Sequence, residues 1–310
     1  MPKRDKILII GSSGMLGIDL WQELRGKYDV IGADLVHSPR LRQGFGGQAR
    51  SAVHRFYKID ITDKNSVLNV VAKVKPDIVV HTAAYTDVDG CELDPKKAYK
   101  VNSNGTRNVA LACRKAAALL VYISTDFVFN GKKKSPYKEN DKPSPLSVYG
   151  DSKLKGEEAV KSILKNYFIL RTSWLYGKYG KNFVDTIIAK GREGNALKVV
   201  DDQVGSPTYT KDLAKAIHAL LDKFFTPNAL RSTQYGIYHV SNSGSVSWFA
   251  YAKEILKLAD IKTKVFPILS KELDRPAKRP AMSVLDNSKF IEFTGYRMCN
   301  WKGALKNYVR

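Results

Sequence analysis

Short apolar runs alternate with amphipathic stretches through the first half of the chain. Each run predicts a β-strand, and several are apolar at nearly every position, as in strands that are covered on both faces. The predicted strands are Ile7–Ile10, Val30–Ala33, Arg55–Ile59, Ile78–His81, Leu119–Ile123 and Phe168–Arg171, and the predicted helices are Leu16–Arg25, Lys64–Lys73, Pro95–Ala118 and Tyr149–Lys165. Repeated strand and helix indicate right-handed crossovers, so the fold class is α/β with a doubly wound parallel sheet.

The second half of the chain, past about Trp174, has a looser pattern. It predicts helices over Asn182–Lys190, Lys211–Lys223 and Ser247–Leu258 and a strand over Gly236–Val240. We therefore expect two domains. Residues 1–172, with a contribution from about 208–240, would form the domain built on the parallel sheet. Residues 173–310 would mainly form a smaller C-terminal cap that completes a cleft and binds substrate.

The composition is that of an ordinary folded protein, with 44% hydrophobic and 26% charged residues. These fractions exclude a disordered chain, a collagen-like repeat and a coiled-coil rod. No apolar run approaches the roughly 20 residues that span a bilayer, and the first run, Ile7–Ile10, is too short for an export signal. Cys91, Cys113 and Cys299 form no CxxC pair. They predict neither a disulfide framework nor a zinc site, and they favour a reducing, cytoplasmic location.

The charge balance is less ordinary than the composition. The chain has 51 Lys and Arg against 30 Asp and Glu, which gives a formal net charge of +21. Such a surplus is compatible with an anionic partner, whether nucleic acid, membrane lipid or a phosphorylated small molecule, and also with a solvated basic surface. We find no RNP-type aromatic motif, zinc finger or helix-turn-helix signature, so nucleic-acid binding is supported by the charge alone and is not expected.

A glycine-rich loop follows the first predicted strand and opens the first predicted helix. Gly11, Gly14 and Gly17 form a GxxGxxG pattern, and Asp34 lies at the end of the second predicted strand, 23 positions after Gly11. Glycines let the backbone turn sharply and approach a pyrophosphate, while a helix N-terminus supplies free N–H donors. The carboxylate of Asp34 can bind the hydroxyls of the adenosine ribose. The pattern therefore predicts a dinucleotide site on a Rossmann fold.

The choice between NADH and NADPH stays open. Asp34 favours NADH because its charge would repel a 2′-phosphate, but Arg40 and Arg42 follow closely and could accept that phosphate. Both arginines belong to a loop rich in Gly, Arg and Gln, His37–Val53, which is long for a connection inside a compact domain.

A second motif pairs a tyrosine with a lysine. Tyr149 and Lys153 are spaced i, i+4, so they share one face of the predicted helix. A phenol has an ordinary pKa of about 10, and we expect the adjacent ammonium to lower the pKa of Tyr149 toward neutrality. Thr125 follows the fifth predicted strand, and its hydroxyl can bind a reacting carbonyl oxygen. Together the three side chains predict proton exchange with a carbonyl substrate.

These motifs resemble an extended short-chain dehydrogenase/reductase, and further segments are similar to the dTDP-4-dehydrorhamnose reductases over nearly the whole chain. The segments that carry the likeness are Asp60–Asp63, His81–Glu92, Val101–Asn102, Ser124–Phe129, Arg171–Gly177, Asp202–Thr208, Arg279–Pro280 and Ser283–Asp286. The loop at 37–53 is longer than the family pattern. The resemblance implies an NAD(P)H-dependent reduction of the C4 carbonyl of dTDP-4-dehydro-6-deoxy-L-mannose. The product, dTDP-L-rhamnose, is a donor for surface polysaccharide.

The resemblance also implies a role for each site residue. Tyr149 would be the proton donor, and Lys153 would modulate it and bind the nicotinamide ribose. The substrate contacts would be Thr125, Asp126, Tyr149 and Trp174, the last by stacking on the deoxyhexose. The other cofactor-binding residues would be Gly11, Gly14, Met15, Leu16 and Gly17 at the pyrophosphate, Asp34 at the ribose, Asp60 and Ile61 at the adenine, and Ala83, Ala84, Tyr85 and Asn102 along the cofactor.

Some members of that family hold magnesium at a subunit interface. Asp19 occupies the helix position of the expected glutamate ligand, and Asp201 and Asp202 are further candidates, with solvated acidic side chains as the alternative. Magnesium and a homodimer are therefore expectations from the resemblance alone, and the residues themselves predict no metal site.

Two other functions remain open. The chain could be a non-catalytic regulatory subunit, because the β subunit of methionine adenosyltransferase shares this fold, or it could reduce another 4-keto sugar nucleotide. The intact set of Thr125, Tyr149 and Lys153 favours an enzyme, since a pure binding module needs no proton-transfer pair. Both expected ligands are pyrophosphates, so they account for part of the positive charge. A solvated basic surface is our interpretation of the rest.

Overall fold

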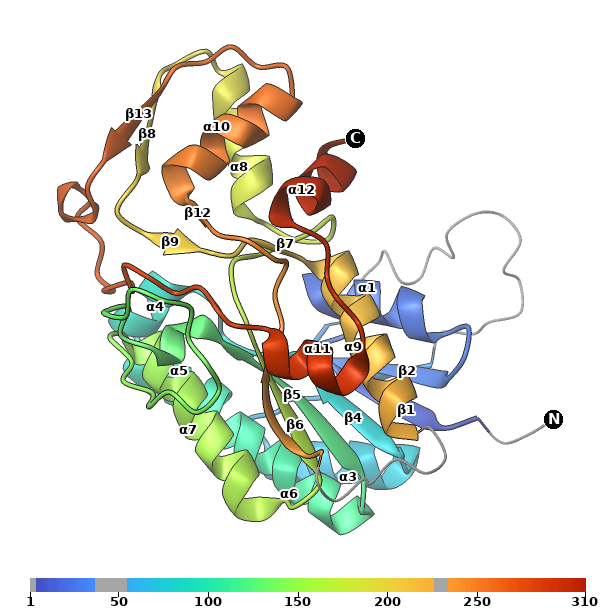
Figure 1. Ribbon diagram of the computed structural model, residues 1–310. Helices are drawn as coiled ribbons and strands as arrows, with labels where there is room; N and C mark the ends of the chain where they lie inside the picture. Colours follow the sequence, from blue (N-terminus) through green and yellow to red (C-terminus); the bar gives the residue numbers. More distant parts are fainter. Residues whose placement is uncertain (1–3, 37–54, 226–233) are drawn as a thin grey trace.

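The computed structural model describes residues 4–36, 55–225 and 234–310. Within these ranges, seven parallel strands form the central sheet in the order β11-β6-β5-β4-β1-β2-β3 (Figure 1). The strands are β1 (Lys6–Ile10), β2 (Asp29–Asp34), β3 (Phe56–Lys58), β4 (Ile78–His81), β5 (Leu119–Thr125), β6 (Tyr167–Thr172) and β11 (Gly236–His239). The predicted doubly wound parallel sheet is confirmed.

Helices cover both faces of this sheet. One face carries α1 (Met15–Leu24) and α9 (Thr210–Phe225), and the other carries α3 (Lys64–Val74), α6 (Thr106–Ala116) and α7 (Val148–Ile163) (Figure 1). Alternate residues of a strand point to opposite faces, so Ile7 and Ile9 pack with the first pair of helices while Leu8 and Ile10 pack with the other three. Because both faces are buried, the strands are apolar at nearly every position.

The prediction of one helix over Pro95–Ala118 is wrong. The segment divides into α5 (Pro95–Ala98), a π-helix η1 (Tyr99–Gly105) and α6, which ends before Ala117 at a left-handed φ of 53°. A π-turn is rare and frequent at functional sites, and it carries Asn102 here. One widened turn changes the apolar spacing too little to be seen in the sequence.

The second half has its own smaller core. It lies among α8 (Phe183–Arg192), α10 (Trp248–Leu258) and α12 (Trp301–Val309), at the top of Figure 1. Three two-stranded sheets complete it: β7 (Leu175–Tyr176) with β10 (Thr208–Tyr209), β8 (Leu197–Val200) with β13 (Val265–Ile268), and β9 (Val204–Gly205) with β12 (Val246–Ser247). The predicted helices at 182–190 and 247–258 are confirmed. The pattern does not predict these short strands, nor α4 (Val88–Leu93) or α12, because so few residues show no clear period.

Three later segments return to the central sheet. Helix α9 packs on α1, strand β11 lies beside β6, and α11 (Ser288–Thr294) packs against both α9 and β11. No helix within the three described ranges has the length and apolar content needed to cross a bilayer.

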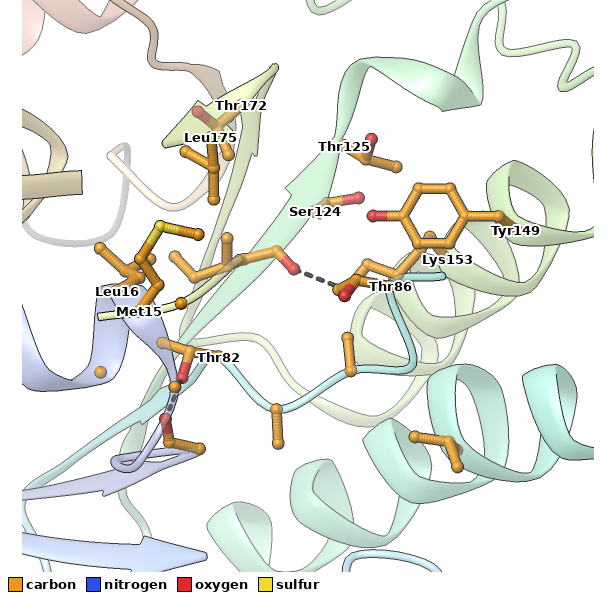
Figure 2. Close-up of a pocket in the computed structure, with 18 of the residues that line it drawn as sticks. Met15, Leu16, Thr82, Thr86, Ser124, Thr125, Tyr149, Lys153, Thr172 and Leu175 are labelled. Atoms are coloured by element: carbon orange, nitrogen blue, oxygen red, sulfur yellow. Dashed lines mark hydrogen bonds between the residues drawn. The ribbon is translucent and has the colours of Figure 1, made fainter. Parts of the chain in front are cut away.

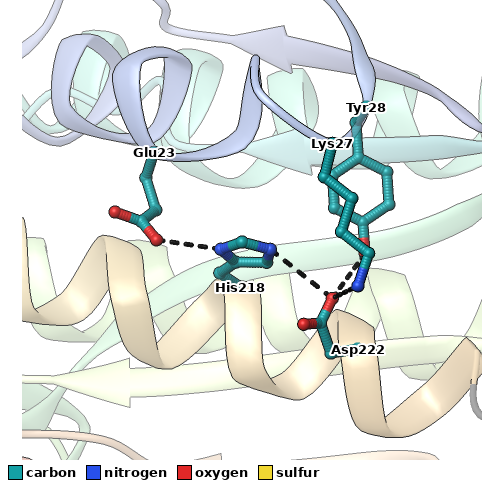
Figure 3. Close-up of polar contacts among 5 residues, drawn as sticks. All are labelled: Glu23, Lys27, Tyr28, His218 and Asp222. Carbon is teal, nitrogen blue, oxygen red and sulfur yellow. Dashed lines mark hydrogen bonds and ion pairs between the residues drawn. The ribbon is translucent and has the colours of Figure 1, made fainter.

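A polar cluster joins α1 and the turn that follows it to α9 (Figure 3). This seam cluster consists of Glu23, Lys27, Tyr28, His218 and Asp222. The imidazole Nδ1 of His218 lies 2.8 Å from Glu23 Oε1, and its Nε2 lies 3.5 Å from Asp222 Oδ1. The same Asp222 oxygen accepts hydrogen bonds from Lys27 Nζ at 2.6 Å and Tyr28 Oη at 3.0 Å.

Candidate active site

A cavity of about 970 Å³ opens at the carboxyl ends of the central strands, where the strand order reverses between β1 and β4. This is the position at which doubly wound sheets bind their ligands. The lining brings together the glycine loop, the ends of β2, β4 and β5, one face of α7, and aromatic side chains of the cap. Of the predicted site residues, Tyr85 and Asn102 are the two outside this lining.

The glycine loop is built for a close approach to a ligand. Gly11 has a φ of 92°, and a Cβ there would lie 2.5 Å from the backbone nitrogen of Ala83. The N-cap residue of α1 is Gly14, and no side chain caps the helix there. The first N–H groups of the helix are therefore available to an anion at the cavity. Met15, Leu16 and Gly17 also line this end.

Thr82 belongs to the segment His81–Glu92 that carries the family likeness, but the motifs assign no role to its side chain. Its hydroxyl bonds to the carbonyl oxygens of Ile10 at 3.0 Å and Gly11 at 3.1 Å, and it lines the cavity. The side chain therefore ties the end of β4 to the glycine loop. Its place beside Gly11 arises from the pairing of β4 with β1, which no local pattern shows.

Asp34 ends β2 at the cavity, as predicted. Its carboxylate accepts hydrogen bonds from the backbone nitrogens of Ser13 at 2.9 Å and Leu35 at 2.8 Å. Burial raises the pKa of Asp34, and these two bonds oppose the rise. Arg40, Arg42 and the whole loop His37–Val53 lie outside the described residues, because positions 37–54 are not described. The exposed side chains of Leu35 and Val36, which the motifs miss, line the cavity beside Asp34.

Asp60 and Ile61, the predicted adenine contacts, both line the cavity. Asp60 Oδ1 accepts hydrogen bonds from the backbone nitrogen of Thr62 at 2.9 Å and from its hydroxyl at 2.8 Å. The side chain of Ile61 packs on Gly105, where a Cβ would come within 2.9 Å of it. Both predicted residues are therefore held by local contacts in the loop after β3.

The predicted cofactor residues in and near the segment after β4 differ in whether they reach the cavity. Ala83 and Ala84 line the cavity. Asn102 is buried behind them, where its amide accepts from the backbone nitrogen of Tyr85 at 2.8 Å and donates to the Tyr85 carbonyl at 3.0 Å. A further bond at 3.0 Å joins Asn102 to Ser152 on α7. Asn102 therefore shapes the segment that borders the cavity, without reaching the cavity itself.

Tyr149 and Thr125 meet at the end of β5. Figure 2 shows the phenol of Tyr149, on α7, pointing toward Ser124 and Thr125. Helix α7 begins at Val148, after the N-cap Ser147, whose side chain accepts a hydrogen bond from the Gly150 nitrogen. Burial raises the pKa of Tyr149, while a hydrogen bond with Thr125 lowers it. The predicted decrease in this pKa is therefore wrong, because burial raises the pKa more than the Thr125 hydrogen bond lowers it.

Lys153 lies one helical turn beyond Tyr149, and its side chain is buried. Its Nζ donates a hydrogen bond of 2.7 Å to the carbonyl oxygen of Ile123 and lies 4.2 Å from the centre of the Tyr122 ring. Burial lowers the pKa of Lys153 to about 7, and the charge of Glu157 opposes this shift.

Asp126 lines the same part of the cavity, directly after Thr125. Burial raises its pKa to about 7, although hydrogen bonds from Ser283 and Thr125 oppose the rise. Within the described residues, its Oδ2 has no hydrogen-bond partner. A buried polar atom without a partner is costly, so this oxygen is well suited to meet a ligand hydroxyl.

Trp174 lies on the cap side of the cavity, and its φ of 48° is unusual for a large side chain. Its indole stacks on that of Trp248, with ring centroids 3.4 Å apart and planes 4° from parallel. Phe183 contacts the same Trp248 at a centroid distance of 4.4 Å. Gly205 makes room for Trp174, since a Cβ there would come within 2.4 Å of the indole. The motifs miss Trp248 and Phe183, which only cap packing brings to the site.

The acidic residues considered for magnesium do not fit a metal site. Asp19 is buried on α1 and accepts a 2.6 Å hydrogen bond from the hydroxyl of Thr210. Asp201 accepts a bond from the Ser247 hydroxyl, and Asp202 accepts bonds from the backbone and side chain of Ser270. Among the residues that the structure describes, no group of three or more His, Cys, Asp or Glu side chains could hold a metal ion. Magnesium is therefore not supported.

Comparison with known proteins gives one consistent family. Residues 5–310 match the family model described as the RmlD substrate binding domain. The chain is 38% identical over 306 residues to the spore coat polysaccharide biosynthesis protein SpsK of Bacillus subtilis (strain 168), covering 98% of this chain and 97% of that protein. It is 39% identical over 305 residues to the dTDP-4-dehydrorhamnose reductase of Streptomyces griseus, covering 97% and 92% of the two chains.

A similar solved structure is that of the dTDP-4-dehydrorhamnose reductase from Bacillus anthracis str. Ames in complex with NADP. The two chains are 39% identical, 98% of each is covered, and the TM-score is 0.84. The likeness therefore extends over the sheet domain and the cap alike.

Proposed function

This chain belongs to the dTDP-4-dehydrorhamnose reductase family, and we propose that it reduces the C4 carbonyl of dTDP-4-dehydro-6-deoxy-L-mannose to give dTDP-L-rhamnose. The observation that carries the proposal is the meeting of Tyr149 and Thr125 at the cavity, with buried Lys153 one helical turn away. A site with these three groups can bind a carbonyl oxygen and give it a proton.

The residues present fit a dinucleotide cofactor. The cradle at Gly11, the uncapped start of α1 at Gly14, and the half-buried Asp34 would hold its pyrophosphate and ribose. When bound, a reduced nicotinamide supplies the hydride. The relative solved with NADP favours NADPH, whereas Asp34 favours NADH, and the ratio of kcat/KM for the two cofactors decides between them.

The proton comes from Tyr149 in this proposal. Because burial raises its pKa, the phenol stays protonated at neutral pH, which is the form that a reduction consumes. The hydroxyl of Thr125 orients the carbonyl oxygen of the sugar beside the phenol. As C4 accepts the hydride, the O–H bond of Tyr149 breaks and its proton moves to that oxygen. The ammonium of Lys153 stabilises the phenolate that remains, and solvent then restores the proton.

The cap would bind the remainder of the substrate. Asp126 offers its unpaired carboxyl oxygen to a sugar hydroxyl, and the stacked Trp174 and Trp248 form an apolar wall. In functional terms we divide the chain as residues 1–172 with about 208–240 for the cofactor, and 173–310 mainly for the sugar nucleotide. The three cysteines are free thiols, which supports a cytoplasmic location.

The test is to mix the protein with NADPH or NADH and a panel of sugar nucleotides, and to follow the nicotinamide absorbance. We expect oxidation with dTDP-4-dehydro-6-deoxy-L-mannose and none with dTDP-glucose, which has no 4-keto group. If the cofactor is oxidised faster with another 4-keto sugar nucleotide, that compound is the substrate, and the proposed reduction of a C4 carbonyl still holds. Cofactor binding without oxidation by any 4-keto sugar would contradict the proposal and favour a regulatory subunit.

A further inference from the structure

A third polar residue of α7 lies in line with the Tyr149–Lys153 pair. Glu157 follows Lys153 by four residues, so the three side chains form one stripe along the helix. The side chain of Glu157 is fully buried. The reaction proposed above gives this carboxylate no task, and a buried charge is costly unless it is paired.

The carboxylate of Glu157 is fully engaged with two neighbouring strands. Arg171 of β6 donates two hydrogen bonds to it, from Nε at 2.9 Å and from Nη2 at 2.7 Å. Ser124 of β5 donates a third from its hydroxyl, at 2.6 Å. Bidentate arginine contacts of this kind fix a carboxylate in one orientation.

The stripe on α7 contacts three consecutive residues at the end of β5. Lys153 bonds to the carbonyl oxygen of Ile123, Glu157 to the hydroxyl of Ser124, and Tyr149 to Thr125. Glu157 therefore anchors the strand end between the attachment points of the lysine and the tyrosine. Ser124 also lines the cavity beside Thr125, so a shift of this anchor would move the site itself.

Glu157 also acts on Lys153 through its charge. The groups that interact with the ammonium are Glu157 on α7, Tyr122 on β5 and His81 on β4. Burial and the lysine lower the pKa of His81 to about 3, so that ring is neutral. Among the described groups that shift the pKa of Lys153, Glu157 alone favours the charged lysine.

We infer that Glu157 is a positioning residue for the Tyr149–Lys153 pair. Held by Arg171, its carboxylate anchors the end of β5 through Ser124 and keeps the ammonium of Lys153 charged beside the tyrosine. This inference rests on the proposed reductase function, because its readout is the rate of that reaction.

The test is the pH dependence of kcat/KM in Glu157→Gln. This variant keeps the shape of the side chain and removes its charge, so Lys153 loses its proton at lower pH. Activity needs the ammonium and falls as the lysine deprotonates. We therefore expect the alkaline limb of the profile to move to lower pH by about one unit. The matched control is Glu158→Gln, the next residue on α7, whose exposed carboxylate pairs with Lys155 at 3.0 Å and whose profile should stay that of the wild type.

Glu157→Asp tests the anchoring separately. It keeps the charge but withdraws it from Ser124, so kcat should fall by about tenfold while the alkaline limb stays near its wild-type position. An alkaline limb in Glu157→Gln that coincides with that of Glu158→Gln would overturn the inference. If Glu157→Gln does not fold, an unchanged kcat in Glu157→Asp overturns it. A wild-type protein that oxidises no cofactor with any 4-keto sugar would instead refute the proposed function.

Discussion

Two polar clusters of this protein use similar chemistry in opposite surroundings. The Glu157–Arg171–Ser124 cluster is almost completely buried, with 0% and 1% of the two charged side chains exposed. The seam cluster joins α1 to α9 at the surface, where 56% of Lys27 and 41% of Asp222 are exposed. A charge without water around it acts strongly on its neighbours, and a charge in water is screened. We therefore expect charge to affect the proposed reaction at the buried cluster and to contribute little to stability at the seam.

The largest effect should follow from removing Tyr149, the proposed proton donor beside the buried cluster. Tyr149→Phe keeps the ring but has no proton to give, so turnover should fall by roughly 10²–10⁴-fold. Steady-state nicotinamide oxidation at saturating substrate measures it. Tyr167→Phe, outside the cavity lining, serves as the control and should keep wild-type turnover. Near-normal turnover in Tyr149→Phe would refute its role as the acid.

Breaking the buried ion pair should cost more stability than breaking the exposed one. Arg171→Met leaves the carboxylate of Glu157 buried without a cation, which costs about 3–5 kcal/mol of unfolding free energy. Lys27→Met removes the matching cation of the seam cluster and should cost only about 0–1 kcal/mol. Urea unfolding of both variants measures the difference. Equal losses of unfolding free energy in the two variants would show that burial does not make one ion pair more important for stability than the other.

A substitution in the cap should weaken binding of the sugar nucleotide and leave the rate of the chemical step little changed. Trp248→Ala removes the ring stacked on Trp174, so the apolar wall of the cavity loosens. We expect KM for the sugar nucleotide to rise by about tenfold with kcat little changed, since an aromatic pair is worth about 0.5–1.5 kcal/mol. Phe266→Ala, an exposed aromatic residue of the cap outside the cavity, is the control. A fall in kcat without a change in KM would place Trp248 in the catalytic step.

The smallest effect should come from Asp222→Asn in the seam cluster. Burial alone would raise the pKa of Asp222, but hydrogen bonds from Lys27 and Tyr28 hold it below its ordinary value of 3.8. The stability that this carboxylate adds is therefore present at neutral pH and is lost as the pH falls below 3.8 through the lowered value. At pH 7 the variant should lose about 0.2–1 kcal/mol, because the pair is exposed. A thermal transition that differs from wild type by the same amount at pH 7 and pH 2.5 would contradict this account.

Much of the cofactor half could be predicted because its signals are local. Strands that are buried on both faces are continuous apolar runs. The glycine pattern at Gly11, Gly14 and Gly17 predicts a turn between a strand and a helix. Tyr149 and Lys153 share a helix face by spacing alone. These features need only neighbours along the chain, so a sequence can show them.

The remainder depends on contacts between distant segments. Trp248 reaches Trp174 only through cap packing, and Arg171 reaches Glu157 only because β6 lies beside β5. The raised pKa of Tyr149 has the same origin, since burial is a property of the folded protein. The π-helix at Tyr99–Gly105 is a small irregularity that apolar periodicity does not reveal.

The most direct test of the central claim follows the hydride itself. The protein is incubated with dTDP-4-dehydro-6-deoxy-L-mannose and NADPH that carries deuterium at the transferred position of the nicotinamide. We predict one deuterium at C4 of the sugar in a dTDP-L-rhamnose product, detected by mass spectrometry and NMR. Cofactor oxidation that leaves C4 of the sugar without deuterium would contradict the account.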